Sequence, residues 1–281
     1  MEPKGKLIII GGHEDKIIDG ENLIIGKRSY QRPYIEILDA LISKEPGSHH
    51  LIEIITTAST LPAQIEEMYR EAYKTAKFYY IGFIHIERPE DGENPSYIQR
   101  VNYCSTVFFT GGDQLRLTSI LNGSKILEVI KRKYHEDKAF VVAGTSAGAM
   151  AIPKTIITGG IIKEALMKGD IKTGGGLEFH SGIIVDTHFI KRGRFARLAH
   201  AVALNPSLLG IGLGEDTALC ITHGNQAECM GSGMAILIDG NEINNTNVHS
   251  ADNETPIIIE NLKVHILAEG SKFDLDKRKF I

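Results

Sequence analysis

The sequence has few cysteines, no tryptophan and no long apolar run. Its three cysteines, Cys104, Cys220 and Cys229, are odd in number and form no CxxC pair, which argues against a disulfide framework and a zinc site. The apolar run nearest the amino terminus, residues 7–10, is too short for a signal-peptide core or a membrane span. We therefore expect a cytoplasmic protein with buried thiols and no membrane partner.

The chain also lacks an excess of either charge. It carries 31 Lys and Arg against 35 Asp and Glu, for a formal net charge of −4, which argues against a nucleic-acid partner. No proline- or serine-rich linker and no internal repeat divides the 281 residues, of which 42% are hydrophobic. These features predict a single domain, residues 1–281, with enough apolar content for its own core.

Short apolar runs alternate with helix-like stretches in the first half of the chain. Such strands, apolar on both faces and separated by helices, predict a three-layer α/β fold with a mostly parallel sheet and helices on both faces. The stretch 62–76 begins on a proline and predicts one of the helices. The predicted strands are residues 7–10, 51–55, 79–84, 106–109 and 139–143.

Beyond residue 175 the apolar runs follow one another at shorter spacing. This spacing predicts a C-terminal antiparallel β extension of the same sheet. The runs are residues 183–185, 208–213, 218–222 and 235–238, followed after Pro256 by 257–259 and 264–267.

The segment 144–148 (GTSAG) follows a predicted strand and precedes a run of small residues. This is the setting of a nucleophile elbow, in which a tight turn exposes Ser146 above the sheet and leaves the amide of Ala147 free to hold an oxyanion. The alternative is a glycine-rich turn in which the serine only caps a helix.

His188 is the histidine best placed to serve as the base for Ser146. It follows the predicted strand 183–185, and the carboxyl ends of strands in such sheets are where ligands bind. Arg192, Arg194 and Arg197 come next and favour an anion, because a guanidinium binds a carboxylate in bidentate fashion. The alternative is a solvated helix face.

Two further turns carry polar groups at strand ends. The amides of Gly112 and Asp113, after the strand 106–109, are candidates to hold an oxyanion, although Asp113 also fits a plain helix cap. Glu215 and Asp216 lie in a second turn, 214–217, which could hold a substrate cation or an arginine of the site. We interpret this second turn as structural.

Taken together and in this order, these motifs resemble those of the cyanophycinase family, serine exopeptidases related to peptidase E. The resemblance covers residues 6–240, most of the chain. The motifs are residues 8–16 (IIIGGHEDK), 109–114 (FTGGDQ), 144–149 (GTSAGA), 186–189 (DTHF) with the three arginines, and 210–218 (GIGLGEDTA).

The resemblance implies a fold like that of class I glutamine amidotransferases, a homodimer, and no metal or cofactor. It implies that Ser146 is the nucleophile and His188 the base, and that multi-L-arginyl-poly-L-aspartate is cut to β-Asp-Arg dipeptides. The third triad residue is expected to be Glu164, with Asp170 and Glu178 as rivals.

The resemblance also places substrate contacts. One departure is Thr187, where well-known members of the family carry glutamine, and a hydroxyl reaches less far than an amide. The implied substrate-binding residues are Gln114, Asp186, Thr187, Arg192, Arg194 and Arg197.

Three alternatives remain. An α/β-hydrolase also uses GxSxG, with a late histidine for which His265 would serve, but it leaves the motif around His188 unexplained. A related peptidase would act on α- or β-aspartyl dipeptides instead of the polymer. A non-enzymatic module that binds anionic peptides is disfavoured by the presence of both Ser146 and His188.

Overall fold

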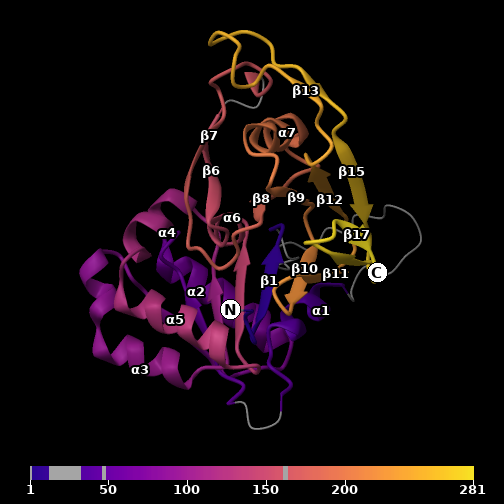
Figure 1. Ribbon diagram of the computed structural model, residues 1–281. Coiled ribbons are helices and arrows are strands. Elements are labelled where there is room, and N and C mark those ends of the chain that lie inside the picture. Colours follow the sequence, from indigo (N-terminus) through magenta and orange to yellow (C-terminus); the bar gives the residue numbers. More distant parts are fainter. Residues whose placement is uncertain (1, 13–32, 46–48, 161–163) are drawn as a thin grey trace, which may run out of the picture.

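The computed structural model describes residues 2–12, 33–45, 49–160 and 164–281, and a nine-stranded sheet lies at its centre (Figure 1). Five neighbouring strands run parallel, in the order β3-β2-β4-β5-β1. They confirm the five predicted strands to within two residues at each end. They are β1 (Lys6–Ile10), β2 (Ile52–Ile55), β3 (Ile81–Ile84), β4 (Thr106–Phe109) and β5 (Val141–Thr145).

Helices cover both faces of the parallel strands, as predicted. Because side chains alternate along a strand, Ile8 and Ile10 share a core with α1 and α2, whereas Leu7 and Ile9 share a core with α3 to α6. The helices are α1 (Pro33–Ala40), α2 (Pro62–Thr75), α3 (Pro95–Tyr103), α4 (Gln114–Leu121), α5 (Lys125–Glu136), α6 (Ala147–Ala151) and α7 (Phe195–Leu204), with a 3₁₀ turn η1 (Pro89–Glu93).

Antiparallel strands extend the central sheet beyond β1. They follow in the order β10-β11-β16-β17 and end the sheet on the side opposite β3. Their bounds are β10 (Ala218–Thr222), β11 (Gln226–Met230), β16 (Lys272–Asp274) and β17 (Lys279–Phe280).

The prediction that every later strand would extend the same sheet is wrong. Most of these runs form a second sheet in the order β15-β12-β9-β8, and two hairpins stand apart from both sheets. The second sheet holds β8 (Ile183–Asp186), β9 (Leu209–Leu213), β12 (Ala235–Asp239) and β15 (Lys263–Leu267), and the hairpins pair β6 (Thr155–Gly159) with β7 (Lys172–Gly175) and β13 (Asn245–Thr246) with β14 (Ile259–Glu260).

The physical reason lies in the apolar pattern of these strands. In β12, Leu237 joins the core shared with the central sheet, whereas Ile238 joins a separate core under α7. A strand that is apolar on both faces needs cover on both faces, and here the central sheet covers one and α7 the other. The second sheet is therefore a layer of its own.

The two sheets meet where β5 and β8, the strands that precede Ser146 and His188, end. The amide of Ser146 donates to Ile10 O at 3.0 Å, and the amide of His188 donates to Gly11 O at 2.9 Å. Gly11 has no room for a side chain, because an added Cβ would lie 1.8 Å from Gly214 O. The loops after β1, β5, β8 and β9 are thereby held together at one edge.

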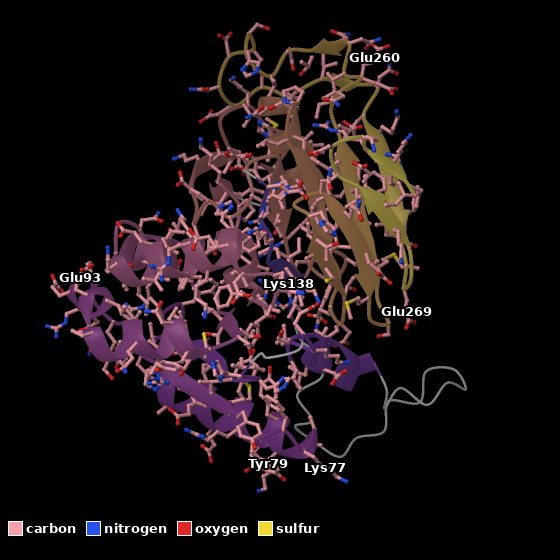
Figure 2. The ribbon with its side chains drawn as sticks, turned by 60° about the horizontal axis from the view of Figure 1, so that its bottom comes forward. Lys77, Tyr79, Glu93, Lys138, Glu260 and Glu269 are labelled. Atoms are coloured by element: carbon pink, nitrogen blue, oxygen red, sulfur yellow. The ribbon has the colours of Figure 1, made fainter. Side chains whose placement is uncertain are left out.

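The amino ends of the parallel strands lie at the other end of the central sheet from these loops. Tyr79, just before β3, is 70% exposed, and Figure 2 shows it at the end of the molecule opposite Glu260 of β14.

Within the described residues no helix combines the length and apolar character needed to cross a membrane.

Candidate active site

Ser146 sits on a strained turn between β5 and α6. Its backbone angles, φ +51° and ψ −116°, are ones that side-chain-bearing residues rarely adopt. The flanking glycines permit this turn: a Cβ at Gly144 would lie 2.6 Å from the carbonyl carbon of Gly148, and a Cβ at Gly148 would lie 2.2 Å from Phe109 O. The strand-turn-helix setting expected of a nucleophile elbow is present.

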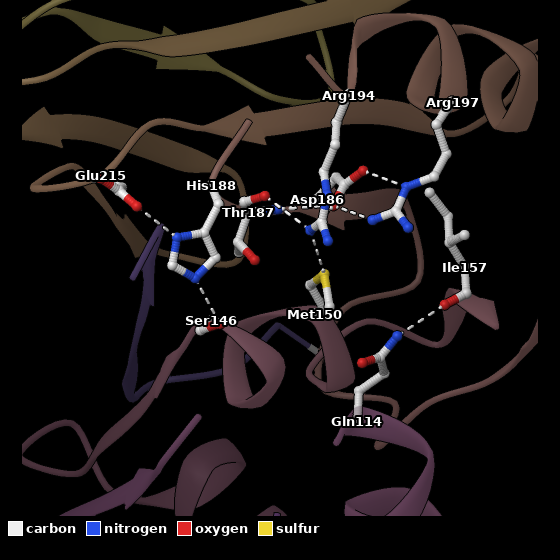
Figure 3. A network of polar contacts seen from close by, with 10 residues as sticks. All are labelled: Gln114, Ser146, Met150, Ile157, Asp186, Thr187, His188, Arg194, Arg197 and Glu215. Carbon is white, nitrogen blue, oxygen red and sulfur yellow. Dashed lines mark hydrogen bonds and ion pairs between the residues drawn. The ribbon is translucent and has the colours of Figure 1, made fainter. Parts of the chain in front are cut away.

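His188 joins Ser146 to a carboxylate (Figure 3). The hydroxyl of Ser146 lies 2.9 Å from Nε2 of His188, and Nδ1 lies 2.9 Å from Oε1 of Glu215. A carboxylate only accepts hydrogen bonds, so the Nδ1 proton points to Glu215 and Nε2 is left to accept the serine proton. Lys191 donates to the other oxygen of Glu215 at 3.1 Å.

The surroundings favour the neutral form of the imidazole. Burial lowers the pKa of His188 below its ordinary value, and the positive charges of Arg192 and Arg194 lower it further, whereas the hydrogen bond that His188 donates to Glu215 raises it. A neutral imidazole can act as a general base, so this electrostatic balance suits proton transfer from Ser146.

The carboxylate partner of His188 is Glu215, whereas the sequence predicted Glu164. Glu164 is exposed in a turn before β7, and Glu178, a rival, is exposed and pairs with Lys131 at 3.2 Å. Asp170, the other rival, is partly buried in the same segment before β7. The sequence feature that points to Glu215 is its place in the turn 214–217, directly after the predicted strand 208–213. The interpretation of this turn as structural alone is wrong.

The predicted arginine cluster is brought together around Asp186. Arg194 Nη1 and Arg197 Nη2 lie 2.9 and 2.5 Å from Asp186 Oδ1, and Arg197 Nε lies 2.8 Å from Oδ2. Asp186 is fully buried and both guanidinium groups are nearly so. Two cations against one carboxylate leave one positive charge in excess.

Figure 3 also shows Thr187 and Gln114, two of the three remaining predicted pocket residues. Thr187 is buried, and its carbonyl accepts from Arg194 Nη1 at 2.9 Å. Gln114 donates from Nε2 to Ile157 O of the β6–β7 hairpin at 3.3 Å. Arg192 is exposed and acts on His188 through its charge.

Of the three predicted oxyanion donors, one is already engaged. The amide of Asp113 donates to Ala58 O at 2.8 Å, while its carboxylate caps α4 by accepting from the amides of Leu115 and Arg116. Asp113 is therefore not a donor to an oxyanion. Among the described residues, no acceptor is found for the amides of Gly112 and Ala147.

Other sequence candidates lie elsewhere. His265, the base of the α/β-hydrolase alternative, sits on β15 with its ring centroid 5.0 Å from Phe273 and 5.9 Å from Phe280. Residues 13–16 of the first motif lie outside the described residues. Within the described chain no group of His, Cys, Asp and Glu side chains is arranged to hold a metal ion.

A serine on a strained turn, bonded to a histidine that is in turn bonded to a carboxylate, defines the site as that of a serine-type hydrolase. Residues 23–229 match the model of Peptidase family S51, and the chain belongs to this family. It is therefore a serine-type peptidase.

Named relatives match over nearly the whole chain. The cyanophycinase of Trichormus variabilis is 32% identical over 98% of this chain and 87% of its own length. The cyanophycinase of Geminocystis herdmanii is 31% identical, covering 96% of this chain and 94% of its own.

Solved structures share the fold. A peptidase from an acI-B1 Actinobacterium covers 97% of this chain and 98% of its own, with 18% identity and a TM-score of 0.70. A putative peptidase E protein from Listeria monocytogenes covers 81% of this chain and 98% of its own, with 12% identity and a TM-score of 0.51.

Proposed function

We propose that this protein is an exopeptidase that hydrolyses cyanophycin, multi-L-arginyl-poly-L-aspartate, and releases β-Asp-Arg dipeptides. The observation that carries the proposal is the hydrogen-bonded line from Ser146 through His188 to Glu215, in a chain whose relatives are named cyanophycinases over nearly its full length.

The chemistry begins with acylation. Ser146 Oγ attacks the scissile carbonyl carbon while Nε2 of His188 takes its proton, and Glu215 stabilises the imidazolium that forms. The carbonyl oxygen becomes an oxyanion held by the amides of Gly112 and Ala147. The C–N bond then breaks, and His188 returns its proton to the leaving amine.

Deacylation repeats these steps with water. Water attacks the backbone carbonyl carbon of the ester, His188 takes one water proton, and the bond from that carbon to Ser146 Oγ breaks as the proton passes from His188 to Oγ. The products are a free carboxylic acid and the original enzyme. Every proton in the cycle is moved by His188, so the reaction needs no metal or cofactor.

We assign the substrate pocket to the residues around Asp186. The excess positive charge of Asp186, Arg194 and Arg197, together with exposed Arg192, favours the carboxylates of an aspartyl substrate. Gln114 and Thr187 complete the pocket, with Gln114 held by the β6–β7 hairpin.

We also propose the wider setting of this activity. The fold is of the class I glutamine amidotransferase type, and both sheets belong to one catalytic domain, residues 1–281. We expect a cytoplasmic homodimer that has neither nucleic acid nor membrane as a partner.

The test is mass spectrometry of the products after purified protein is incubated with cyanophycin, with Ser146→Ala alongside. We expect β-Asp-Arg from the wild type and none from the variant. A folded wild type that releases nothing would contradict the proposed substrate, and α- and β-aspartyl dipeptides would be the next substrates.

A further inference from the structure

The glycine turn beside Ser146, residues 111–113, contacts the loop that follows β2. A Cβ built on Gly111 would lie 3.4 Å from the Cβ of Ser146, so this turn contacts the nucleophile. A Cβ built on Gly112 would lie 2.1 Å from Ala58 O, and the amide of Asp113 donates to that same oxygen at 2.8 Å. Ala58 thus restricts the position of the Gly112 peptide.

The loop that carries Ala58 is itself held by Arg116 of α4. Nε of Arg116 donates to Thr57 O at 3.0 Å, one residue before Ala58. The backbone amide of Arg116 also donates to the Asp113 carboxylate, at 3.3 Å, and so links α4 to the glycine turn. One residue therefore joins α4, the glycine turn and the loop after β2.

These hydrogen bonds matter because oxyanion stabilisation depends on donors that are fixed in place before the reaction. The backbone at Gly112, with φ +143°, is one that only glycine adopts readily, so position 112 has no side chain that could fix its amide. The restriction comes from Ala58 and, through Thr57, from Arg116.

We infer that Arg116 is a positioning residue for the oxyanion donor at Gly112, acting through Thr57 and Ala58. This inference rests on the proposed acyl-transfer function. We expect its effect on the oxyanion and not on substrate binding or proton transfer, because its hydrogen bonds go to Thr57 and Asp113 and not to Asp186 or His188.

The experiment compares Arg116→Met, which keeps an apolar stem but no donor, with Arg116→Lys, which keeps a donor. We expect Arg116→Met to lower kcat about tenfold, less than the 10²–10³ typical of losing an oxyanion donor outright. KM stays within about twofold and the acid limb of the pH profile does not move, because His188 is untouched. Arg116→Lys recovers most of kcat.

The matched control is Arg132→Met on α5, which removes a 2.9 Å hydrogen bond to Asn102 and leaves kcat unchanged. An Arg116→Met enzyme with wild-type kcat, or with a shifted acid limb, would overturn the inference. If Arg116→Met does not fold, Arg116→Gln replaces it under the same criteria.

A second readout separates this inference from the proposed substrate. A fluorophosphonate reacts with Ser146 and places its phosphoryl oxygen where the oxyanion forms, whatever the natural substrate. Wild-type labelling at Ser146 without cyanophycin hydrolysis would reject the substrate only. Equal labelling rates for wild type and Arg116→Met would reject the role of Arg116.

Discussion

Ser146 and His188, the nucleophile and base of the proposed mechanism, come from two regions that are built differently. Ser146 lies in the central parallel sheet, where five residues of continuous sequence, 144–148, form the turn that holds it. His188 and Glu215 follow two strands of the second sheet, β8 and β9, and lie 27 residues apart in the chain.

This difference shows that two kinds of physical constraint meet in one site. The serine is held by local sterics, since each flanking glycine is required by backbone packing within a few ångströms. The histidine and glutamate are held by tertiary hydrogen bonds between the sheets, such as that from His188 N to Gly11 O. We therefore expect mutations near Ser146 to act by changing the backbone of its turn. Mutations near His188 and Glu215 should act by changing the hydrogen bonds and charges that link the two sheets.

The largest effect is expected from Glu215→Gln, with Glu164→Gln as its matched control. An amide at position 215 no longer stabilises the imidazolium, so kcat should fall about 10²–10⁴-fold, the range seen when a triad carboxylate is replaced. Steady-state kinetics with both variants measures this. Loss of activity in Glu164→Gln with a fully active Glu215→Gln would reverse the assignment of the third residue.

The local constraint is tested by Gly148→Ala. The added Cβ would lie 2.2 Å from Phe109 O, so the turn must shift, and we expect a loss of about 1–3 kcal/mol of unfolding free energy together with reduced kcat. Chemical denaturation and kinetics measure the two losses. Gly175→Ala is the control, because a Cβ there meets no atom within 4 Å; equal stability of the two variants would count against steric control of the elbow.

The electrostatic coupling is tested by Arg192→Gln. Arg192 helps to lower the pKa of His188, so its removal raises that pKa and moves the acid limb of kcat/KM to higher pH. Activity below pH 6.5 should fall about two- to threefold relative to the plateau, the size expected for a screened surface charge. A pH–rate profile with an unmoved acid limb would show that this charge does not reach His188.

The same pKa carries a consequence for stability. The folded protein holds the pKa of His188 below its unfolded value, so below about pH 6.5 the unfolded chain binds more protons and stability falls as pH falls. Above that pH the imidazole is neutral in both the folded and the unfolded chain, and His188 causes no loss of stability. Arg192→Gln raises the folded pKa and so reduces the loss at low pH, which urea unfolding at pH 5 and pH 8 measures.

The smallest effect is expected from Lys191→Met. Lys191 is 64% exposed, and its contact with Glu215 is an ion pair that water and salt weaken. We expect kcat to fall about twofold at low salt. At high salt the wild type should approach the variant, and a difference that persists there would mean that Lys191 does more than pair with Glu215.

The parallel half of the fold and the serine turn could be predicted because their signals are local. The run 139–143 and the segment 144–148 specify strand and elbow from neighbouring residues alone. The placement of runs such as 235–238 in a second sheet could not be predicted, because strands that are apolar on both faces fit either layer until α7 is seen to cover Ile238.

The sequence by itself identified the family and predicted the serine turn and the histidine that contacts it, because each depends on residue types in a fixed local order. Only the tertiary structure decided that Glu215 accepts from His188, that Asp186 holds Arg194 and Arg197, and that Ala58 already occupies the amide of Asp113. These contacts join segments far apart in the chain or on different elements. A hydrogen bond needs its partners within about 3 Å, and only the packing of the two sheets brings them that close.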